Sequence, residues 1–580
     1  MRDRFPLTRF AAGRPASGWP LLFALPVCQL AAIIWLVWNR TPHLPWWDEW
    51  ELANFLEVAD LGRLHLADFW TFQNEHRIFL PRLILFALIK LTAWDRQVIM
   101  TLNLVVACVG AALIGVGLRR TVGAVGARLL FVPASLLLFS FGNYENWLFA
   151  FQLNFILAFC GVACCLWALT PLSADRGATD RRWWFAVLGA IVASLSTLSG
   201  LVAWFAFLPA IWRCGRVARA VWCLTAVGII LPYFNGFPRG TVVRASLLDA
   251  IDYALVCLGA PLGATVSLAR LWGFVGVAGM AALLLAYWRS GGQWRRLAGW
   301  LGLALHALGT VLVTTIGRAA LGPEQALTSR YRLFSALWWV ALLVVGYLAV
   351  VAVRRAAAPR WSPRIVRRAT IAACLLGGLP LLLGLGQANR AGFVDGLNWQ
   401  ESFRQHERCV LDYPEASDDC LEEFYVSAPI VRIHAAFLEQ HQLGAFRAAA
   451  TSAPLRLTRG GSILAKIDTV DGTAVTDEVA TVSADAPVVI RGWALDSAAR
   501  APGSTVYLWI DERYTYRAVY GDERPDVAAT TGIAATEVGF AATLPPGMLT
   551  PREHTLTVVV VAADGRSYGV SPQPMTIAAR

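Results

Sequence analysis

Long apolar runs, each about as long as a lipid bilayer is thick, dominate the first two-thirds of the chain. About 20 apolar residues in a helix span the hydrocarbon core of a bilayer. One run, 183–212, is long enough to be two short helices that turn near Ser199 and Gly200. The pattern therefore predicts a polytopic α-helical membrane protein with about eleven spans over residues 1–387. The ten runs are 20–38, 97–118, 129–144, 146–170, 183–212, 220–235, 264–288, 297–317, 333–353 and 369–387.

A different pattern follows the last apolar run. Residues 388–455 carry apolar side chains at helical spacing, as at Ile433 and Phe437, and we expect a soluble helical segment there. We interpret residues 456–482 as a linker. From residue 483 to 580, short alternating runs are separated by Gly, Pro and Asp, which predicts an antiparallel β-sandwich of immunoglobulin-like type.

Three aromatic residues stand out in the predicted sandwich, at Trp493, Tyr507 and Trp509. We expect them in its core, because large aromatic side chains usually supply core packing. A platform on which sugars stack is the alternative.

Composition agrees with this division. Of the 580 residues, 57% are hydrophobic and only 15% are charged, which excludes a single soluble domain. Residues 1–387 contain 34 Arg and Lys against 15 Asp and Glu, whereas residues 388–580 contain 16 against 24. A membrane-embedded body is thus joined to a mildly acidic soluble one. The basic residues cluster in short loops between apolar runs, which indicates membrane orientation and not nucleic-acid binding.

Charge in the loops predicts how the chain is oriented. Six segments carry 22 of the 34 basic residues of the first body and only three acidic ones. By the positive-inside rule these segments are cytoplasmic, so the N-terminus lies inside and the C-terminal domain outside. In a bacterial inner membrane the outside is the oxidising periplasm, where Cys409 and Cys420 are expected to form a disulfide. The six segments are 1–19, 119–128, 171–182, 213–219, 289–296 and 354–368.

The first outer loop, residues 39–96, is long, charged and aromatic. It opens on the run WWDEWE, in which Asp48 and Glu49 are adjacent carboxylates just beyond the first span. A carboxylate at the lipid surface can take a proton from an acceptor hydroxyl while a lipid-borne donor lies alongside. Alternatively, the tryptophans form an interfacial belt and Asp48 caps a helix. Residues 78–93 contain Arg82 and Lys90, so we expect an interfacial helix there and not a span.

Further candidate site residues lie in three outer segments. His76, Arg77 and Arg82 flank the start of the interfacial helix and are placed to pair with a phosphate or pyrophosphate, or else they merely anchor the helix by snorkelling. A second loop carries the lone Glu145. A third ends in Arg330, Tyr331 and Arg332 directly before a span, where arginines on the outer side require an anionic partner.

This plan of a first span, an acidic pair, interfacial helices and a second acidic outer loop resembles the GT-C fold of polyprenyl-phosphate-sugar glycosyltransferases. Protein O-mannosyltransferases and the lipid A aminoarabinose transferase have this fold, and the resemblance covers most of residues 15–387. It implies that Asp48 is the catalytic base, with Glu49 beside it. It also implies that His76 and Arg77 bind the donor phosphate.

The same resemblance relates Glu145 to a second catalytic carboxylate and Arg330-Tyr331 to an Arg-Tyr pair before a late span. This chain differs from the relatives in two places: Asn-Glu-His-Arg stands where they have a Glu-Lys-Pro type motif, and Glu145 stands where they often have Asp. The fold analogy is thus firmer than any assignment of the donor.

The function implied is that of an inverting membrane glycosyltransferase. It moves a sugar from a polyprenyl-phosphate donor to a glycan, lipid or protein acceptor, among membrane lipids and without nucleic acid. We assign no cofactor: the cations already in place could make a metal dispensable, but paired acids also suit a divalent ion, so a metal stays open. The rival hypotheses are a lipid or glycan transporter, and a non-catalytic, membrane-anchored glycan-binding protein. His306 is the clearest polar residue inside the predicted spans, and their general lack of charge weighs against an ion-coupled carrier.

Overall fold

The chain forms two compact units in the computed structural model. The first, here the helical unit, comprises Met1–Thr41, His65–Ala87 and Gln97–Glu401, and the second, here the mixed unit, comprises Pro42–Leu64, Leu88–Arg96 and Ser402–Arg580. Most of the predicted cytoplasmic segments 1–19 and 171–182 lies outside the described residues. The described residues are 19–60, 64–170, 180–238, 245–357, 362–449, 458–475, 479–484, 486–511, 514–544, 549, 551–564 and 567–580.

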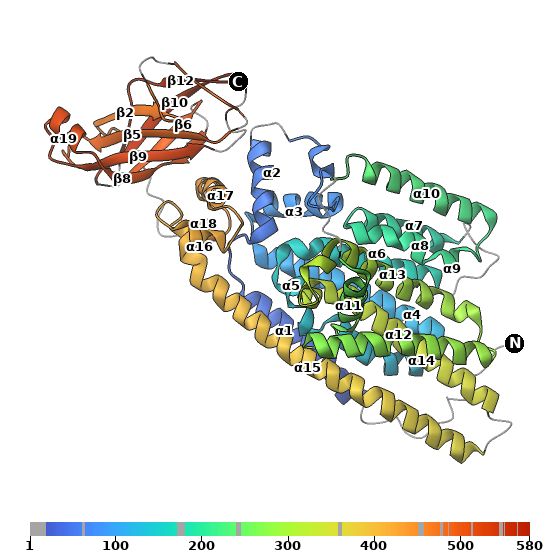
Figure 1. Ribbon diagram of the computed structural model, residues 1–580. Coiled ribbons are helices and arrows are strands. Elements are labelled where there is room, and N and C mark those ends of the chain that lie inside the picture. Colours follow the sequence, from blue (N-terminus) through green and yellow to red (C-terminus); the bar gives the residue numbers. More distant parts are fainter. Residues whose placement is uncertain are drawn as a thin grey trace. The chain divides into compact units, whose positions relative to one another are not determined.

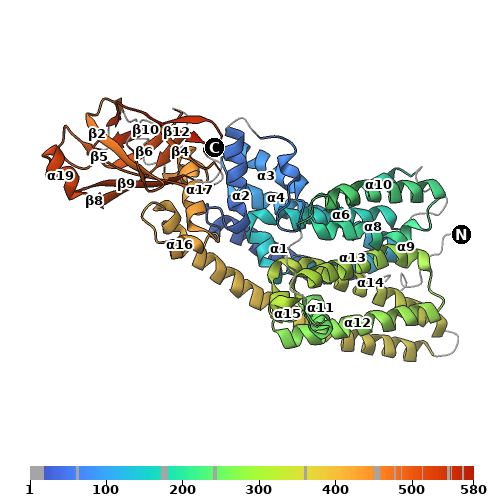
Figure 2. The same ribbon diagram turned by 45° about the horizontal axis from the view of Figure 1, so that its top comes forward.

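Helices account for nearly all regular structure in the helical unit. In both views, α6, α7, α8 and α13 lie side by side, and α12 lies beside α14 (Figures 1 and 2). The helices are α1 (Trp19–Arg40), α3 (Phe79–Thr92), α4 (Arg96–Leu138), α5 (Tyr144–Leu148), α6 (Leu153–Leu169), α7 (Arg181–Ser194), α8 (Val202–Ala206), α9 (Leu208–Ile211), α10 (Arg216–Phe234), α11 (Leu247–Gly259), α12 (Val266–Arg289), α13 (Trp294–Arg318), α14 (Arg332–Ala357) and α15 (Pro363–Leu411).

Seven helical stretches of the described residues are long and apolar enough to cross a membrane. This establishes a membrane-embedded protein by the physical criterion of length and hydropathy. The stretches are Phe23–Arg40, Arg96–Leu148, Ala150–Leu169, Arg216–Phe234, Val266–Arg289, Trp294–Leu321 and Ser329–Ala357.

The difference from the eleven predicted spans has three sources. The predicted spans 97–118 and 129–144 fall in one continuous stretch, Arg96–Leu148. The predicted pair in 183–212 is present as α7 and the apolar stretch Leu198–Ile211, but each has only 14 residues. The last predicted span, 369–387, falls in α15, where several side chains are not described.

A backbone break at Gly123 divides α4 where the sequence predicts a loop. Its φ of +78° and ψ of 177° are inaccessible to most L-residues, so the chain changes direction there while remaining nearly helical on both sides. The two predicted spans are therefore separate helices joined by a single glycine.

The sequence did not predict α11, which packs against α12 backbone to backbone. A Cβ added to Gly259 would lie 1.8 Å from the carbonyl oxygen of Ala269, and one added to Gly273 would lie 1.9 Å from that of Leu255. Glycine at both positions permits this approach, because any side chain would collide with the neighbouring backbone.

Two β-sheets form most of the mixed unit. One sheet has the order β3-β2-β5-β9-β8, and in the other β10 pairs with β6 on one side and with β11 and β12 on the other. The strands are β1 (Thr458–Arg459), β2 (Ile463–Val470), β3 (Thr473–Ala474), β4 (Val479–Val482), β5 (Val488–Asp496), β6 (Thr505–Ile510), β7 (Tyr514–Arg517), β8 (Val519–Glu523), β9 (Glu537–Leu544), β10 (Glu553–Val561), β11 (Ser567–Val570) and β12 (Met575–Ala579).

Side chains from both sheets meet in one apolar core, so the domain is a two-sheet sandwich. Ile490 of one sheet and Leu508 and Val560 of the other belong to the same buried cluster. Pairing is antiparallel except between β1 and β11 and between β12 and β4, which are parallel. The all-antiparallel prediction is thus wrong for these two pairs, because β1 and β4 come from the stretch 456–482 that the sequence analysis treats as a linker.

The linker prediction is wrong as well, since β1 to β4 all begin within residues 456–482. These strands are short, and β3 has both residues exposed, so their alternation is too brief to stand out in the sequence. The predicted boundary at 387 is also not a break, because α15 continues without interruption from Pro363 to Leu411.

The prediction that Tyr507 and Trp509 lie in the core is wrong. Along β6 the buried residues are Val506, Leu508 and Ile510, and the two aromatic residues alternate with them on the opposite face. Successive side chains of a strand point to opposite faces, so neighbours of buried residues must face outward. Trp493 likewise alternates with the buried residues of β5 and packs, partly buried, against a small satellite cluster.

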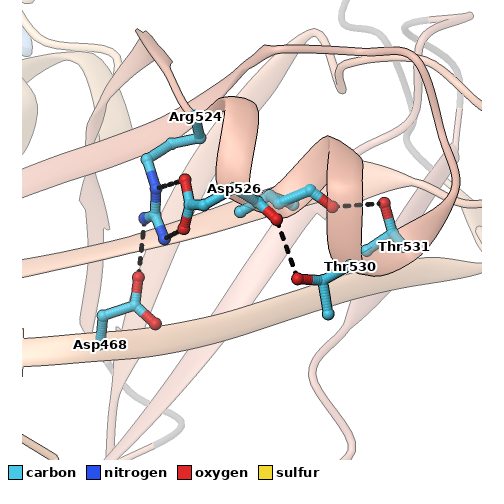
Figure 3. A network of polar contacts seen from close by, with 6 residues as sticks. Asp468, Arg524, Asp526, Thr530 and Thr531 are labelled. Atoms are coloured by element: carbon cyan, nitrogen blue, oxygen red, sulfur yellow. Dashed lines mark hydrogen bonds and ion pairs between the residues drawn. The ribbon is translucent and has the colours of Figure 1, made fainter.

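Short helices complete the mixed unit: α2 (Trp50–Asp60), α16 (Asp418–Glu422), α17 (Ala428–Gln440), α18 (Ala445–Ala449) and α19 (Pro525–Thr531). A guanidinium group ties α19 to the sandwich. Arg524 donates to both oxygens of Asp526 at 2.8 and 2.6 Å and to Asp468 of β2 at 2.7 Å (Figure 3). The same arginine keeps the pKa of the Asp526 carboxyl at about 2.

A disulfide joins Cys409 at the end of α15 to Cys420 in α16, with the two Cα atoms 6.1 Å apart. It closes the turn between the two helices.

Candidate functional site

Two chain segments far apart in the sequence meet at the end of α13. Arg318, the last residue of that helix, donates to Glu75 Oε1 at 2.9 Å. The Nε2 atom of His76 lies 3.8 Å from the same carboxylate oxygen. Glu75 and Arg318 are each about one-third exposed, with side-chain exposures of 34% and 33%, so both remain open to a ligand.

The imidazole of His76 is held by the backbone on its other side. The backbone N–H of Leu198 points to His76 Nδ1 at 3.3 Å, so Nδ1 accepts and the proton belongs on Nε2, facing Glu75. Burial lowers the pKa of His76, and Arg318 and Arg330 lower it further, although Glu75 opposes them. The two arginines are thus the permanent cations of this cluster.

Arg330 reaches the cluster from the connector before α14. It lies in a one-turn 3₁₀ helix, η10 (Ser329–Tyr331), and its guanidinium lies 5.5 Å from the ring centre of Tyr331. Tyr253 of α11 interacts electrostatically with both Arg318 and Arg330, and its hydroxyl donates to Gln325 Oε1.

Glu145 fixes the turn that presents Arg330. Its Oε2 accepts from Ser329 Oγ at 2.6 Å and from the Arg330 backbone N–H at 3.0 Å, and its Oε1 lies 3.9 Å from Arg330 Nη1. The residue is only 8% exposed. With one oxygen occupied by the turn, Glu145 positions Arg330 in this structure.

These contacts define what we call the arginine cluster: Glu75, His76, Arg318, Arg330 and Glu145. Arg318 lies near the end of one candidate span, Trp294–Leu321, and Arg330 near the start of the next, Ser329–Ala357, so the cluster lies at the ends of these two helical stretches. Two guanidinium groups of this kind bind phosphate through charge-assisted hydrogen bonds.

The other predicted phosphate-binding arginines are occupied by backbone carbonyls. Arg77 donates through Nε to the Tyr233 carbonyl at 2.8 Å and through its other nitrogens to the carbonyls of Trp70 and Asn235. Its guanidinium also lies 3.8 Å from the ring centre of Phe72. Through these contacts Arg77 joins the segment around Trp70 to the C-terminal end of α10.

Arg82 and Arg332 are held in a similar way. Arg82 donates to the Thr71 carbonyl at 2.6 Å and to Gln73 Oε1 at 2.9 Å. Arg332 donates twice to the Leu327 carbonyl, at 2.9 and 2.7 Å. Both are nearly fully buried, so the structure does not bring them together with the arginine cluster as ligand-facing groups.

The predicted acidic pair lies in the mixed unit and separates into two environments. Glu49 is fully buried against Arg96, with Nε 2.8 Å from Oε2, and it also accepts from the Trp46 backbone N–H at 3.2 Å. Asp48 is partly exposed and interacts electrostatically with Tyr425, whose hydroxyl donates to Glu51 at 3.4 Å. Burial, with Glu51 and Asp48 nearby, raises the pKa of Tyr425 to about 12.

Among the described residues, no group of three or more His, Cys, Asp or Glu side chains is arranged to hold a metal ion. Sequence reasoning missed Arg318 and Glu75 as members of the cluster and Tyr253 as a residue that interacts with its arginines. Arg318 was detectable as an arginine at the end of an apolar run, but its partner is 243 residues away in the chain.

Comparison with family models, curated proteins and solved structures found no match to this chain. The resemblance to GT-C glycosyltransferases therefore stays an expectation from the sequence.

Proposed function

We propose that the chain is an integral membrane glycosyltransferase that moves a sugar from a polyprenyl-phosphate donor to a hydroxyl-bearing acceptor, with inversion. The observation that supports this best is the arginine cluster. Arg318 and Arg330, each with a side chain 33% exposed, come from the ends of consecutive candidate spans and both act on His76. A lipid-linked phosphate is the anion that reaches such a boundary from within the bilayer.

In this reaction the acceptor oxygen attacks the anomeric carbon, and the bond from that carbon to the phosphate oxygen breaks. The electron pair leaves with the polyprenyl phosphate, whose charge Arg318 and Arg330 stabilise. A carboxylate takes the proton of the acceptor hydroxyl.

Two carboxylates are candidates for that base. Asp48 follows from the resemblance alone. Glu75 is supported by its position beside Arg318: burial would raise the pKa of its carboxyl, but His76 and Arg318 hold it below the ordinary value, so Glu75 is ionised at neutral pH. Glu49 is excluded from this role in our proposal, because Arg96 occupies its carboxylate.

The proposal also includes the membrane in which the protein lies and the type of its β-sandwich domain. A bacterial inner membrane with the sandwich in the periplasm suits the Cys409–Cys420 disulfide, since disulfides persist in that compartment. An immunoglobulin-like type suits two packed sheets of mainly antiparallel strands. Labelling of cysteines introduced into residues 119–128 tests the orientation: reaction with a membrane-impermeant reagent from the periplasm would overturn it.

The decisive test is transfer by the purified full-length protein from a panel of polyprenyl-phosphate sugars. We expect transfer from at least one donor, with loss of at least 100-fold in either Asp48→Asn or Glu75→Gln. Loss in one variant alone identifies the base. Binding of the donors without transfer would instead indicate a carrier or a glycan-binding protein.

A further inference from the structure

Four buried polar side chains without hydrogen-bond partners lie on or directly beside two elements that pack together, η7 and α13. The 3₁₀ helix η7 (Leu198–Leu201) follows Thr197 and packs against α13, as α8 does. His306 and Thr197 are 0% exposed, Thr310 5% and Ser199 6%. Among the described residues, none bonds to either nitrogen of His306 or to the hydroxyls of the other three, although the Ser199 backbone faces the imidazole.

Neighbouring hydroxyls in the same elements are satisfied, so the four are exceptional for their surroundings. Ser194 and Ser196 donate to carbonyls of α7 at 2.7 and 2.6 Å. Thr314 and Thr315 donate to carbonyls of α13 at 2.9 and 2.8 Å. Among the described residues of 181–201 and of α13, the hydroxyls without a partner are those of Thr197, Ser199 and Thr310.

Helix geometry brings two of the four groups together, and the other two belong to one short segment that packs against the same helix. Thr310 lies one turn beyond His306 on the same face of α13. Ser199 lies against His306, and Thr197 precedes η7 directly. Leaving such groups unpaired costs about 1–3 kcal/mol each, which a bundle of apolar helices does not tolerate without a compensating ligand.

The same segment touches the arginine cluster. Leu198, between Thr197 and Ser199, is the residue whose backbone N–H points to His76 Nδ1. Thr197 and Ser199 thus adjoin the residue that contacts His76, and both arginines act electrostatically on that imidazole.

We propose that Thr197, Ser199, His306 and Thr310 form a hydroxyl-binding site that holds water in the resting protein and hydroxyl groups of the sugar headgroup when the donor is bound. This rests on the proposed function for its ligand. The site supplies the groups that recognise hydroxyls. Three side-chain hydroxyls can each donate and accept a hydrogen bond, and the imidazole donates from one ring nitrogen and accepts at the other. The surrounding apolar helices exclude bulk water, and such exclusion strengthens each hydrogen bond.

Radiolytic hydroxyl-radical footprinting of the full-length protein tests the site without any activity, since a buried side chain is oxidised when water lies against it. We expect oxidation of His306 well above that of Trp300. Trp300 is on the same helix, is 0% exposed and has its indole N–H bonded to Thr121 at 2.9 Å. A rate for His306 no higher than that for Trp300 would overturn the proposal.

Paired valine variants locate the water. Thr310→Val should lower His306 oxidation at least fivefold, and Thr315→Val, whose hydroxyl already bonds to its own helix, should leave it unchanged. Equal effects of both variants would contradict the site.

Comparison of two lipids tests whether the site binds the sugar headgroup. Undecaprenyl phosphate carrying a hexose should protect His306 from oxidation, and undecaprenyl phosphate alone should not. Protection by neither would overturn the headgroup assignment. Protection by the sugar lipid together with no transfer in any assay would remove the transferase and keep the site, so the two proposals fail separately.

Discussion

Glu49 and Arg96 form an ion pair in which the side chains are 1% and 0% exposed. Arg96 Nη2 also donates to Glu49 Oε1 at 3.1 Å and Nη1 donates to the Pro42 carbonyl at 2.8 Å. Of two adjacent acids in the sequence, one is thus committed to the core of the mixed unit, whereas Asp48 stays partly exposed.

The first prediction concerns this pair. Glu49→Gln should lower the free energy of unfolding by about 3–5 kcal/mol, because it leaves the Arg96 charge buried without its counter-ion. Chemical denaturation of the purified protein measures this. The double variant Glu49→Leu/Arg96→Met should recover most of the loss. A Glu49→Gln protein of wild-type stability that has lost transfer would show a catalytic role instead.

The second prediction concerns binding of lipid phosphate. Arg318→Gln and Arg330→Gln should each weaken binding of undecaprenyl phosphate by about 10- to 100-fold, the value of a charge-assisted hydrogen bond. Quenching of tryptophan fluorescence in nanodiscs measures the affinity. Arg270→Gln is the control, since Arg270 forms a comparable exposed ion pair, with Asp252, between α11 and α12. An equal loss in that variant would indicate a non-specific charge effect.

The third prediction is a pH dependence that originates at His76. Its pKa in the folded protein is lower than in the unfolded chain, so the unfolded state binds the extra proton first. Stability should therefore be complete above pH 6.5 and fall as the pH drops below it. His76→Gln should remove part of this slope in melting temperatures between pH 7.5 and 5. An unchanged slope would place the titration at other histidines.

The fourth prediction concerns the glycine that divides α4. Gly123→Ala should destabilise the protein by about 1–3 kcal/mol, because alanine resists a positive φ. Gly228→Ala in α10 is the matched control: a Cβ meets nothing within 4 Å at either position, but Gly228 has no positive φ. The control should be neutral or stabilising by up to about 1 kcal/mol. Similar melting temperatures for the two variants would contradict a backbone origin.

The fifth prediction concerns the disulfide. In denaturant without reductant, nine of the eleven cysteines should react with a maleimide, and all eleven after reduction. The Cys409→Ser/Cys420→Ser variant should lose about 3 kcal/mol of stability, as for a loop of this length. Reaction of all eleven before reduction would exclude the bond.

Several features of the candidate site were accessible to sequence reasoning and others were not. Arg330 and Glu145 were singled out because charges next to apolar runs are rare. Their contact, 3.9 Å across 185 residues of sequence, required the packed helices. Arg77 and Arg82 are also charged residues next to an apolar run, yet their guanidinium groups donate to backbone carbonyls. The loop conformation determines which backbone carbonyls accept hydrogen bonds from an arginine. A pattern of residue types does not predict that conformation.

The periodicity of the chain determined its apolar helices, its sandwich strands from β5 to β10, and the change between them, because hydropathy and alternation are local properties. Only tertiary structure decided which face of β6 holds Trp509. It also decided whether a guanidinium donates to a carboxylate or to a backbone carbonyl, and that Thr310 and His306 are buried without hydrogen-bond partners. Those outcomes depend on which distant segment fills the space beside a side chain, and hydrogen bonding and burial are fixed only once that neighbour is in place.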